Sequence, residues 1–389
     1  MDTVIDDIGW KARASALAAE LVAQGVLDDP VWANAFATTP RHLFTPRVVD
    51  DEGVVLLAGQ RTWLETVYSD TALLTQTTPA GDGEQKLPTS SSSKPAVMAV
   101  MLDRLDLHRG HRVLEIGTGT GYNTALLCRR LDGGSNVYSI DIHRRLVEAA
   151  REHLARIGYR PCLATRDGVA GWREHAPFDR ILATCAITGI PAQWIRQLAD
   201  GGRIVAPLDA GDAGPLLVLD KTAPDEVAGR IDPYPAWFMP LREHVDSPLG
   251  PGQSTGFTTT GMAHYGTTTT DPATLLTDDA DLVLFLWLHL PGLRLAGGRP
   301  CGSVVAHTAD ALAEARLTPD RNGTWEVVQR GRRRLWDTIE HAVTAFETLG
   351  RPDRSRYGVT ALEDLDSQYV WLDDPHGAYS FPLLARGQE

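Results

Sequence analysis

A glycine-rich segment between a strand pattern and a helix pattern constrains the fold of this chain more than any other feature. The segment reads VLEIGTGTGYNTALL, residues 113–127, in which a short apolar run ends at three closely spaced glycines. Glycine lets the backbone turn tightly and come close to a ligand. The helix that follows presents its N-terminus, which attracts negative or polar groups. The segment therefore predicts a ligand site at the carboxyl end of a buried strand.

Alternating strands and helices around this segment indicate the fold class. Expected strands occupy residues 112–117, 136–141, 161–168, 178–186 and 203–208. Expected helices occupy residues 122–131, 144–158 and 191–202, the last ending at two glycines. This repetition predicts an α/β fold with a mostly parallel sheet and helices on both faces. Right-handed crossovers then determine most of its topology.

The chain before this alternation is expected to be helical. Helices are expected at residues 8–26, 29–40 and 95–105. The second of them has Asp29 as its cap and Pro30 at its first position. Residues 79–94 are rich in Pro, Gly and Ser, and they are typical of an exposed connection.

The alternation is lost beyond about residue 230. The segment STGFTTTGMAHYGTTTTD predicts loops or edge strands, and residues 331–350 predict a long helix that ends at a glycine. RYGVTALE and QYVWLDDP predict two strands joined by a turn. We therefore divide the chain into an N-terminal helical segment (1–80), an α/β core (81–229) and a C-terminal α+β extension (230–389).

Composition excludes several classes of protein. The net charge of −13 argues against a dedicated nucleic-acid binder, because neutralising phosphates needs a basic surface. The longest apolar run, LVLFLWLHL at 282–290, is too short to cross a bilayer and predicts a buried strand. The N-terminus, MDTVIDDIGW, lacks the apolar region of a signal peptide. The four cysteines form no CxxC pair, so neither a metal site nor a disulfide framework is indicated. We expect a cytoplasmic monomer without membrane association.

The spacing of the glycines separates two cofactor classes. A dehydrogenase would show GxGxxG, whereas this chain has GxGxG with Glu115 two residues before the first glycine. That form resembles the cofactor loop of S-adenosylmethionine-dependent methyltransferases. The resemblance implies cofactor contacts from Glu115, Gly117, Thr118, Gly119, Gly121 and Tyr122.

Residues at the ends of the later strands extend this expected cofactor site. Asp141, followed by Ile142, ends the second strand, where an acid can accept hydrogen bonds from both ribose hydroxyls. The alternative for Asp141 is a cap of the next helix. Asp167 and Gly168 end the third strand, and Asp167 either meets the adenine amino group or serves as a turn residue. Thr184 ends the fourth strand, at the edge where ligands bind in such folds.

Several motifs together carry a resemblance to one family. VLEIGTGTGYNTALL, VYSID, RDGVAGW, PFDRILATCA and QLADGGRIVAPL resemble, in order and spacing, the protein-L-isoaspartate O-methyltransferase family. ATTPRHLFTP and VYSDTALL are similar to its N-terminal signature, so the resemblance covers roughly residues 28–210. It implies a Rossmann-like sheet, S-adenosylmethionine as methyl donor with S-adenosylhomocysteine as product, and a peptide or protein substrate.

The segment LPTSSSSKPAVMAVM, residues 87–101, admits three interpretations. Taken alone, it is typical of a flexible connector or of a helix start. In the family, a Ser-x-Pro segment lies here and its hydroxyl is near the carboxylate that is methylated. The resemblance thus implies catalytic roles for Ser93 and Ser92, and substrate contacts from Ser90, Ser91 and Lys94. The insertion around TTPAGDGEQK and the additional serines depart from the family and indicate an altered acceptor pocket.

The reaction that this resemblance implies needs no strong general base. A carboxylate with a pKa near 4 is already ionised at neutral pH. The enzyme has to align the two reactants and exclude water. His42 and Arg41 are therefore expected to be structural, with Arg41 packing the N-terminal helices onto the sheet.

Three functions remain open at this point. The extension and the serine-rich segment resemble methyltransferases that act on ribosomally made peptides. Our first hypothesis is methylation of an Asp in a ring-modified precursor, a graspetide or lanthipeptide, which leads to an aspartimide. The second is repair of isoaspartate in damaged proteins, and the third is a non-catalytic module that binds S-adenosylmethionine and recognises peptides. The basic run QRGRRRLW, 329–336, either contacts acidic groups of the substrate or is a solvated helix start.

Overall fold

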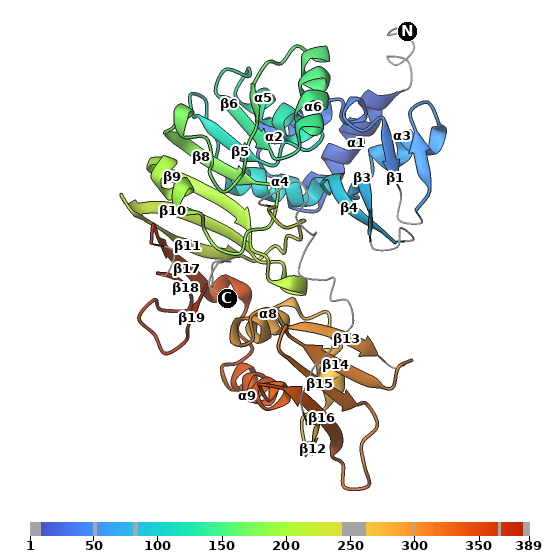
Figure 1. The fold of residues 1–389 in the computed structure, drawn as a ribbon. Coiled ribbons are helices and arrows are strands. Elements are labelled where there is room, and N and C mark those ends of the chain that lie inside the picture. Colours follow the sequence, from blue (N-terminus) through green and yellow to red (C-terminus); the bar gives the residue numbers. More distant parts are fainter. Residues whose placement is uncertain are drawn as a thin grey trace.

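The computed structural model describes residues 9–49, 53–80, 85–242, 262–298, 300–364 and 367–383. In this part of the chain the strands form one sheet of ten, one of four and one of five strands. In Figure 1 the four-stranded sheet lies at the upper right, the ten-stranded sheet on the left and the five-stranded sheet at the bottom, and the C-terminus lies beside the last strands of the ten-stranded sheet.

The parallel half of the ten-stranded sheet contains the predicted alternation. Its order is β9-β8-β5-β6-β7. The strands are β5 (Val113–Ile116), β6 (Val137–Asp141), β7 (Cys162–Thr165), β8 (Phe178–Ala183) and β9 (Leu198–Pro207). The helices are α4 (Pro95–Arg104), α5 (Tyr122–Arg130), α6 (Arg144–Arg156) and α7 (Ala192–Gln197). These predictions are confirmed except for the end of α7, because Leu198 already pairs with Phe178 of β8.

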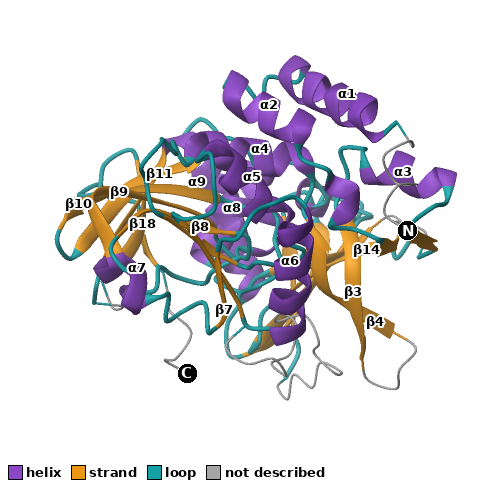
Figure 2. Ribbon diagram, turned by 90° about the horizontal axis from the view of Figure 1, so that it is seen from above, coloured by secondary structure: helices purple, strands orange, loops and turns teal. Residues whose placement is uncertain are grey.

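Two hydrophobic cores lie on opposite faces of this sheet. Alternate residues of one strand enter different cores, since successive side chains point to opposite faces. Val113 packs in the core that contains α4, α5 and α6, and Leu114 packs in the core that contains α7. Helices therefore cover both faces, as predicted, and Figure 2 shows the strands between them.

The N-terminal part combines helices with a small sheet. Its elements are α1 (Trp10–Ala23), α2 (Pro30–Thr38), α3 (Arg61–Val67), β1 (Arg47–Val49), β2 (Val55–Leu57), β3 (Leu73–Ala80) and β4 (Gln85–Ser92). The Asp29 side chain accepts a hydrogen bond from the Val31 amide at 2.7 Å, as expected of the cap. The prediction of an exposed connection at 79–94 was wrong for the described residues, because Gln85–Ser92 form β4; residues 81–84 lie outside the described part of the chain. Antiparallel pairing of β4 with β3 satisfies the backbone there despite its Pro and Ser content.

The C-terminal part contributes to two sheets. β10 (Leu216–Ala223) and β11 (Glu226–Asp232) continue the ten-stranded sheet, followed by β17 (Tyr357–Leu362), β18 (Gln368–Leu372) and β19 (Ser380–Pro382). The second sheet consists of β12 (His264–Thr268), β13 (Arg294–Gly298), β14 (Ser303–His307), β15 (Ala311–Arg316) and β16 (Trp325–Gly331). The extension is thus not one separate unit, because its last strands pair with the core.

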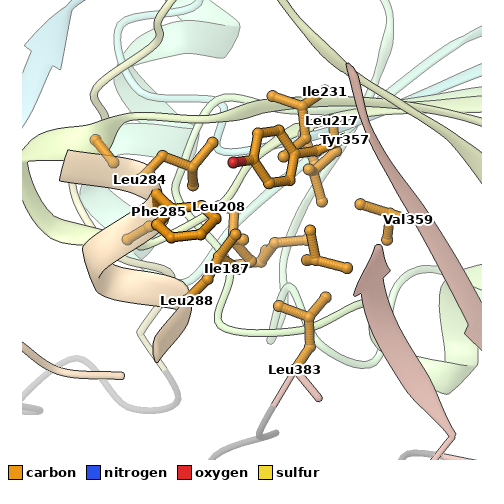
Figure 3. Packing of buried hydrophobic residues seen from close by; sticks show 14 of the residues in the cluster. Ile187, Leu208, Leu217, Ile231, Leu284, Phe285, Leu288, Tyr357, Val359 and Leu383 are labelled. Carbon is orange, nitrogen blue, oxygen red and sulfur yellow. The ribbon is translucent and has the colours of Figure 1, made fainter. Parts of the chain in front are cut away.

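Helix α8 (Ala280–His289) occupies the apolar run that we predicted to be a buried strand. That prediction was wrong because a short run buried on all sides has no periodicity that separates helix from strand. Asp279 caps the helix by accepting hydrogen bonds from two backbone amides. α8 packs against α9 (Leu335–Thr348) and, through Leu284, Phe285 and Leu288, against the ten-stranded sheet (Figure 3). No helix in the described residues is long and apolar enough to cross a membrane.

The packing around α8 contains a buried tyrosine whose hydroxyl has no partner. Tyr357 of β17 is fully buried, and its ring lies beside Leu284 (Figure 3). Its hydroxyl finds no hydrogen-bond acceptor or donor among the described residues. Since such a group costs about 1–3 kcal/mol to bury, we expect Tyr357→Phe to raise the free energy of unfolding by about 1 kcal/mol. Urea denaturation measures this change.

Tyr68 provides the matched control. Its buried hydroxyl lies 2.7 Å from Nδ1 of His42, so Tyr68→Phe should lower the free energy of unfolding by about 1 kcal/mol. A loss of stability in Tyr357→Phe would mean that its hydroxyl is hydrogen-bonded in solution.

Candidate functional site

One pocket lies at the carboxyl ends of β5, β6 and β8, where β4 crosses in front of the glycine loop. It brings together most of the site residues predicted from the sequence. These are Ser90, Ser91, Ser92, Ser93, Lys94, Gly117, Thr118, Gly119, Tyr122, Asp141, Ile142, Gly168 and Thr184. Glu115, Gly121 and Asp167 do not line it.

The glycine loop takes a backbone conformation that other residues rarely adopt. Gly117 has φ +102° and Gly121 has φ +88°. The Gly117 amide donates to the Ile140 carbonyl at 2.8 Å, and the Thr184 hydroxyl donates to the Gly117 carbonyl at 2.7 Å. Strand β6 and the end of β8 therefore hold the loop from both sides.

The loop and the serine strand face each other across the pocket. A Cβ atom on Gly119 would lie 3.7 Å from the Ser91 carbonyl oxygen, which is van der Waals contact. The side of the pocket that carries the predicted cofactor residues is thus directly opposite the side that carries the predicted acceptor residues.

Asp141 connects the loop to the next helix. Its carboxylate accepts hydrogen bonds from the amides of Gly119 and His143, both at 2.9 Å. Burial raises its pKa, and these two backbone bonds oppose that change. Because a carboxylate offers about four lone-pair sites, it can accept two more hydrogen bonds, such as those of two ribose hydroxyls. The capping and ribose roles are therefore compatible.

Glu115 lies behind the loop and is fully buried. It accepts hydrogen bonds from Asn123 Nδ2 at 2.7 Å, from Ser139 Oγ at 2.6 Å and from the Thr124 hydroxyl. Burial raises the pKa of Glu115 to about 7, although these hydrogen bonds favour the charged form. The carboxylate thus bonds to the start of α5 beneath the loop, and the direct cofactor contact of Glu115 stays a prediction.

The other two predicted residues outside the pocket lining have local roles. A Cβ on Gly121 would come within 2.9 Å of the Ala150 Cβ, so glycine lets the loop pack closely on α6. Asp167 is exposed, and its carboxylate accepts from the Val169 amide at 2.9 Å. This is the turn role that we kept as the alternative for Asp167.

Arg41 holds the segment that carries the predicted acceptor residues. Its buried guanidinium donates to the backbone carbonyls of Val67, Ser69, Thr71, Ser92 and Ser93 at 2.9–3.4 Å, and also to the Ser92 hydroxyl. Burial lowers the pKa of Arg41 to about 10, so the group remains charged at neutral pH. We expected Arg41 to pack helices, but the structure places it directly beneath the serine segment.

The four serines at 90–93, of which the last directly follows β4, divide into two pairs. Ser90 and Ser92 are buried, and their hydroxyls accept from Thr75 Oγ1 at 3.1 Å and from Arg41 Nε at 3.4 Å. Ser91 and Ser93 are less buried and also line the pocket. Alternation along a strand therefore directs one pair toward the scaffold and the other away from it.

Asp70 attaches the serine segment to helix α4. It accepts from the Ala96 amide at 2.8 Å, and its other oxygen lies 3.5 Å from Lys94 Nζ. An acid at a helix N-terminus stabilises that helix. Lys94 thus enters the pocket lining with an acidic partner beside it.

One wall of the pocket was not predicted from the sequence. The segment 237–242, Trp-Phe-Met-Pro-Leu-Arg, lines it. Backbone hydrogen bonds attach this segment to the end of β8, because Ala186 donates to Met239 at 2.9 Å and Leu241 donates to Ala186 at 2.7 Å. Trp237 is 56% exposed at the pocket, which is unusual for a large aromatic side chain. Apolar residues in an irregular segment after the last core strand were the available signal in the sequence.

The pocket residues fit a nucleoside cofactor with an amino-acid group. The Oδ1 atom of Asn123 is buried and has no hydrogen-bond partner in the described residues. Asn123 lines the pocket, so this oxygen can accept a hydrogen bond from a ligand. Asp141 can accept from ribose, and the loop of Gly117 and Gly119 leaves room for close approach.

Comparison with known proteins agrees with this assignment. Residues 12–245 match the family Protein-L-isoaspartate(D-aspartate) O-methyltransferase (PCMT). The protein-L-isoaspartate O-methyltransferase of Methylorubrum populi is 35% identical over 234 residues, which cover 60% of this chain and 96% of the relative. That of Rhodospirillum rubrum is 36% identical over 248 residues, covering 62% of this chain and 98% of the relative.

A solved structure shares the fold beyond the family match. A protein-L-isoaspartate O-methyltransferase superposes with a TM-score of 0.51 and 22% identity, covering 94% of this chain and 98% of that chain. The predicted fold class and the predicted methyl donor are thus confirmed. The chain belongs to the protein-L-isoaspartate (D-aspartate) O-methyltransferase family and is an S-adenosylmethionine-dependent methyltransferase.

Proposed function

We propose that the protein methylates the carboxylate of an isoaspartyl residue in a peptide or protein, which is held against the β4 serines. One observation carries this proposal. The Ser91 carbonyl lies 3.7 Å from the position of a Cβ on Gly119, so an acceptor beside β4 is next to the cofactor loop.

The residues of the pocket support this reaction by aligning the acceptor carboxylate with the methyl donor. When bound, S-adenosylmethionine supplies an electrophilic methyl group on sulfur. An acceptor carboxylate needs no base, because it is ionised at neutral pH. Ser91 and Ser93 can donate hydrogen bonds that orient it, and the wall of Phe238, Met239 and Leu241 excludes water. The resulting ester is open to attack by the next backbone nitrogen, which expels methanol and closes a succinimide.

Family membership supports isoaspartate as the acceptor. The named relatives at 35–36% identity match this chain over nearly their full length. In this role the succinimide hydrolyses and part of the product is ordinary aspartate, which is repair.

A second acceptor is an Asp of a ring-modified peptide, in which the succinimide persists. One feature favours it as a candidate. The β3–β4 hairpin places Pro88 and Thr89 at the pocket beside the serines, and this wall supplies surface for a folded substrate. Residues 262–348 add a five-stranded sheet with two helices outside the segment that matches the family, but the solved isoaspartate methyltransferase covers 94% of this chain, so this region does not separate the two acceptors.

Mass spectrometry with four substrates separates the candidates. The purified chain and S-adenosylmethionine are incubated with a linear isoaspartyl peptide, its aspartyl twin, a ring-bearing precursor peptide and the linear form of that precursor. We expect the isoaspartyl peptide to gain a methyl group and then lose methanol, whereas its twin stays unchanged. Methylation of the ring-bearing peptide alone would establish the second acceptor. Cofactor binding without methylation of any substrate would indicate a recognition module.

A further inference from the structure

The β3–β4 hairpin carries two β-bulges beside the pocket. The pairs Leu74↔Ser91, Gln76↔Ser90 and Thr77↔Pro88 leave Thr75 on β3 and Thr89 on β4 without an opposite residue. Bulges redirect side chains and occur often next to active sites. The two threonines therefore lie outside the regular residue pairing of β3 with β4.

The backbone carbonyl of Thr89 has a hydrogen-bond partner in the described residues, whereas its side-chain hydroxyl has none. Its carbonyl accepts a hydrogen bond from Arg242 Nη2 at 3.4 Å. Its side chain is buried, with 9% of the residue exposed, and the hydroxyl oxygen has no partner in the described residues. Thr75 differs in this respect, because its hydroxyl donates to Ser90 Oγ. Burying a hydroxyl without a hydrogen-bond partner costs free energy, unless a ligand supplies the missing hydrogen bond.

Arg242 brings a positive charge to the same wall. Both Arg242 and Thr89 line the pocket, at the point where segment 237–242 meets the hairpin. Burial raises the pKa of Asp141, and the charge of Arg242 opposes that change. The guanidinium therefore has an electrostatic effect on a carboxylate that lines the pocket. A guanidinium has several N–H donors in one plane, and it matches the geometry of a carboxylate.

We propose that Thr89 and Arg242 form a carboxylate-binding subsite at the hairpin wall of the pocket. The Thr89 hydroxyl donates one hydrogen bond to the carboxylate, and Arg242 supplies the opposite charge. This inference rests on the proposed function only if the carboxylate comes from the peptide, and not if it comes from the cofactor. The carboxylate belongs either to the amino-acid end of the cofactor or to an acidic residue next to the acceptor in the peptide.

Two binding ratios distinguish these sources in the full-length protein. The first is the affinity for S-adenosylhomocysteine relative to 5′-methylthioadenosine, which lacks the amino-acid group. The second is the affinity for an isoaspartyl peptide with Glu beside the acceptor relative to the same peptide with Gln there. It is measured in the protein saturated with S-adenosylhomocysteine. Both are measured by calorimetry in the natural protein, in Thr89→Val and in Arg242→Met.

We expect one of the two ratios to fall about tenfold or more in both variants, as for the loss of a hydrogen bond to a charged group. A fall in the first ratio assigns the subsite to the cofactor, and a fall in the second assigns it to the peptide. Thr75→Val, in which the lost hydroxyl belongs to the other bulge, should leave both ratios unchanged. The proposal is overturned if neither ratio changes, or if Thr75→Val changes them equally.

These measurements need no methyl transfer, so they remain informative if the proposed acceptor is wrong. A protein that binds S-adenosylhomocysteine but methylates no isoaspartyl peptide would refute the proposed function. The first ratio would still decide whether Thr89 and Arg242 hold the cofactor's carboxylate. Absence of any difference between the Glu and Gln peptides in the natural protein would exclude the peptide as the source.

Discussion

Gly117→Ala should weaken the binding of S-adenosylhomocysteine by about a hundredfold or more. At φ +102° any other residue is strained, which costs about 1–3 kcal/mol. The added Cβ would also lie 2.6 Å from the Thr184 hydroxyl oxygen, closer than such atoms approach. Since that hydroxyl donates to the Gly117 carbonyl, the loop must shift where it contacts the cofactor. Isothermal titration calorimetry measures the loss.

Gly110 offers a control for the backbone strain alone. It has φ +89°, and a Cβ there would meet no atom within 4 Å. Gly110→Ala should therefore lose about 1–3 kcal/mol of stability through backbone strain alone, while it binds S-adenosylhomocysteine normally. The double variant Gly117→Ala/Thr184→Ala removes the clashing oxygen and should regain part of the affinity. Unchanged binding in Gly117→Ala would show that the loop does not contact the cofactor.

The parts of the fold that the sequence predicted are those governed by local pattern. Strands β5, β6 and β8 are short apolar runs, and α5 and α6 follow them with helical spacing. The glycine loop was predictable because its backbone conformation demands a particular residue type. Asp29 and Pro30 likewise define the start of α2 within a few residues.

The parts that were missed depend on distant segments. β4 is a strand because β3 pairs with it, and nothing in its Ser-rich composition favours a strand. α8 is apolar on all sides because the ten-stranded sheet and α9 cover it. The return of β17 to pair with β11 joins residues more than a hundred positions apart, and no local signal encodes that pairing.

The candidate site shows the same division. Residues of the loop and the strand ends were predicted because topology alone brings parallel strand ends together. The wall at 237–242 was missed because backbone pairing with Ala186 holds it there. The function of Arg41 was missed because all of its backbone acceptors lie 26 or more positions away.

Arg41→Met should lower kcat/KM for the acceptor by about a thousandfold, because the serine segment loses hydrogen bonds from a charged donor that are worth about 1.5–3 kcal/mol each. Methionine fills a similar volume but donates no hydrogen bond. The carbonyls of Ser92 and Ser93 would lose their donor, and the serine segment would separate from the turn at 67–71. The affinity for S-adenosylhomocysteine should change much less, because Arg41 does not line the pocket. Steady-state kinetics and calorimetry together test this separation.

Two further variants distinguish positioning from a general loss of stability. Arg41→Lys keeps the charge and three N–H donors, so it should recover part of the activity. Arg180 is also buried and donates to the backbone carbonyls of Leu105, Asp106 and Asp179, at the opposite end of β8. Arg180→Met should lower stability without a selective loss of acceptor turnover. If both methionine variants lose acceptor turnover and cofactor binding in parallel, Arg41 stabilises the fold and has no particular role at the acceptor. A selective loss in Arg41→Met would instead assign the alignment of the acceptor to a guanidinium that touches neither reactant.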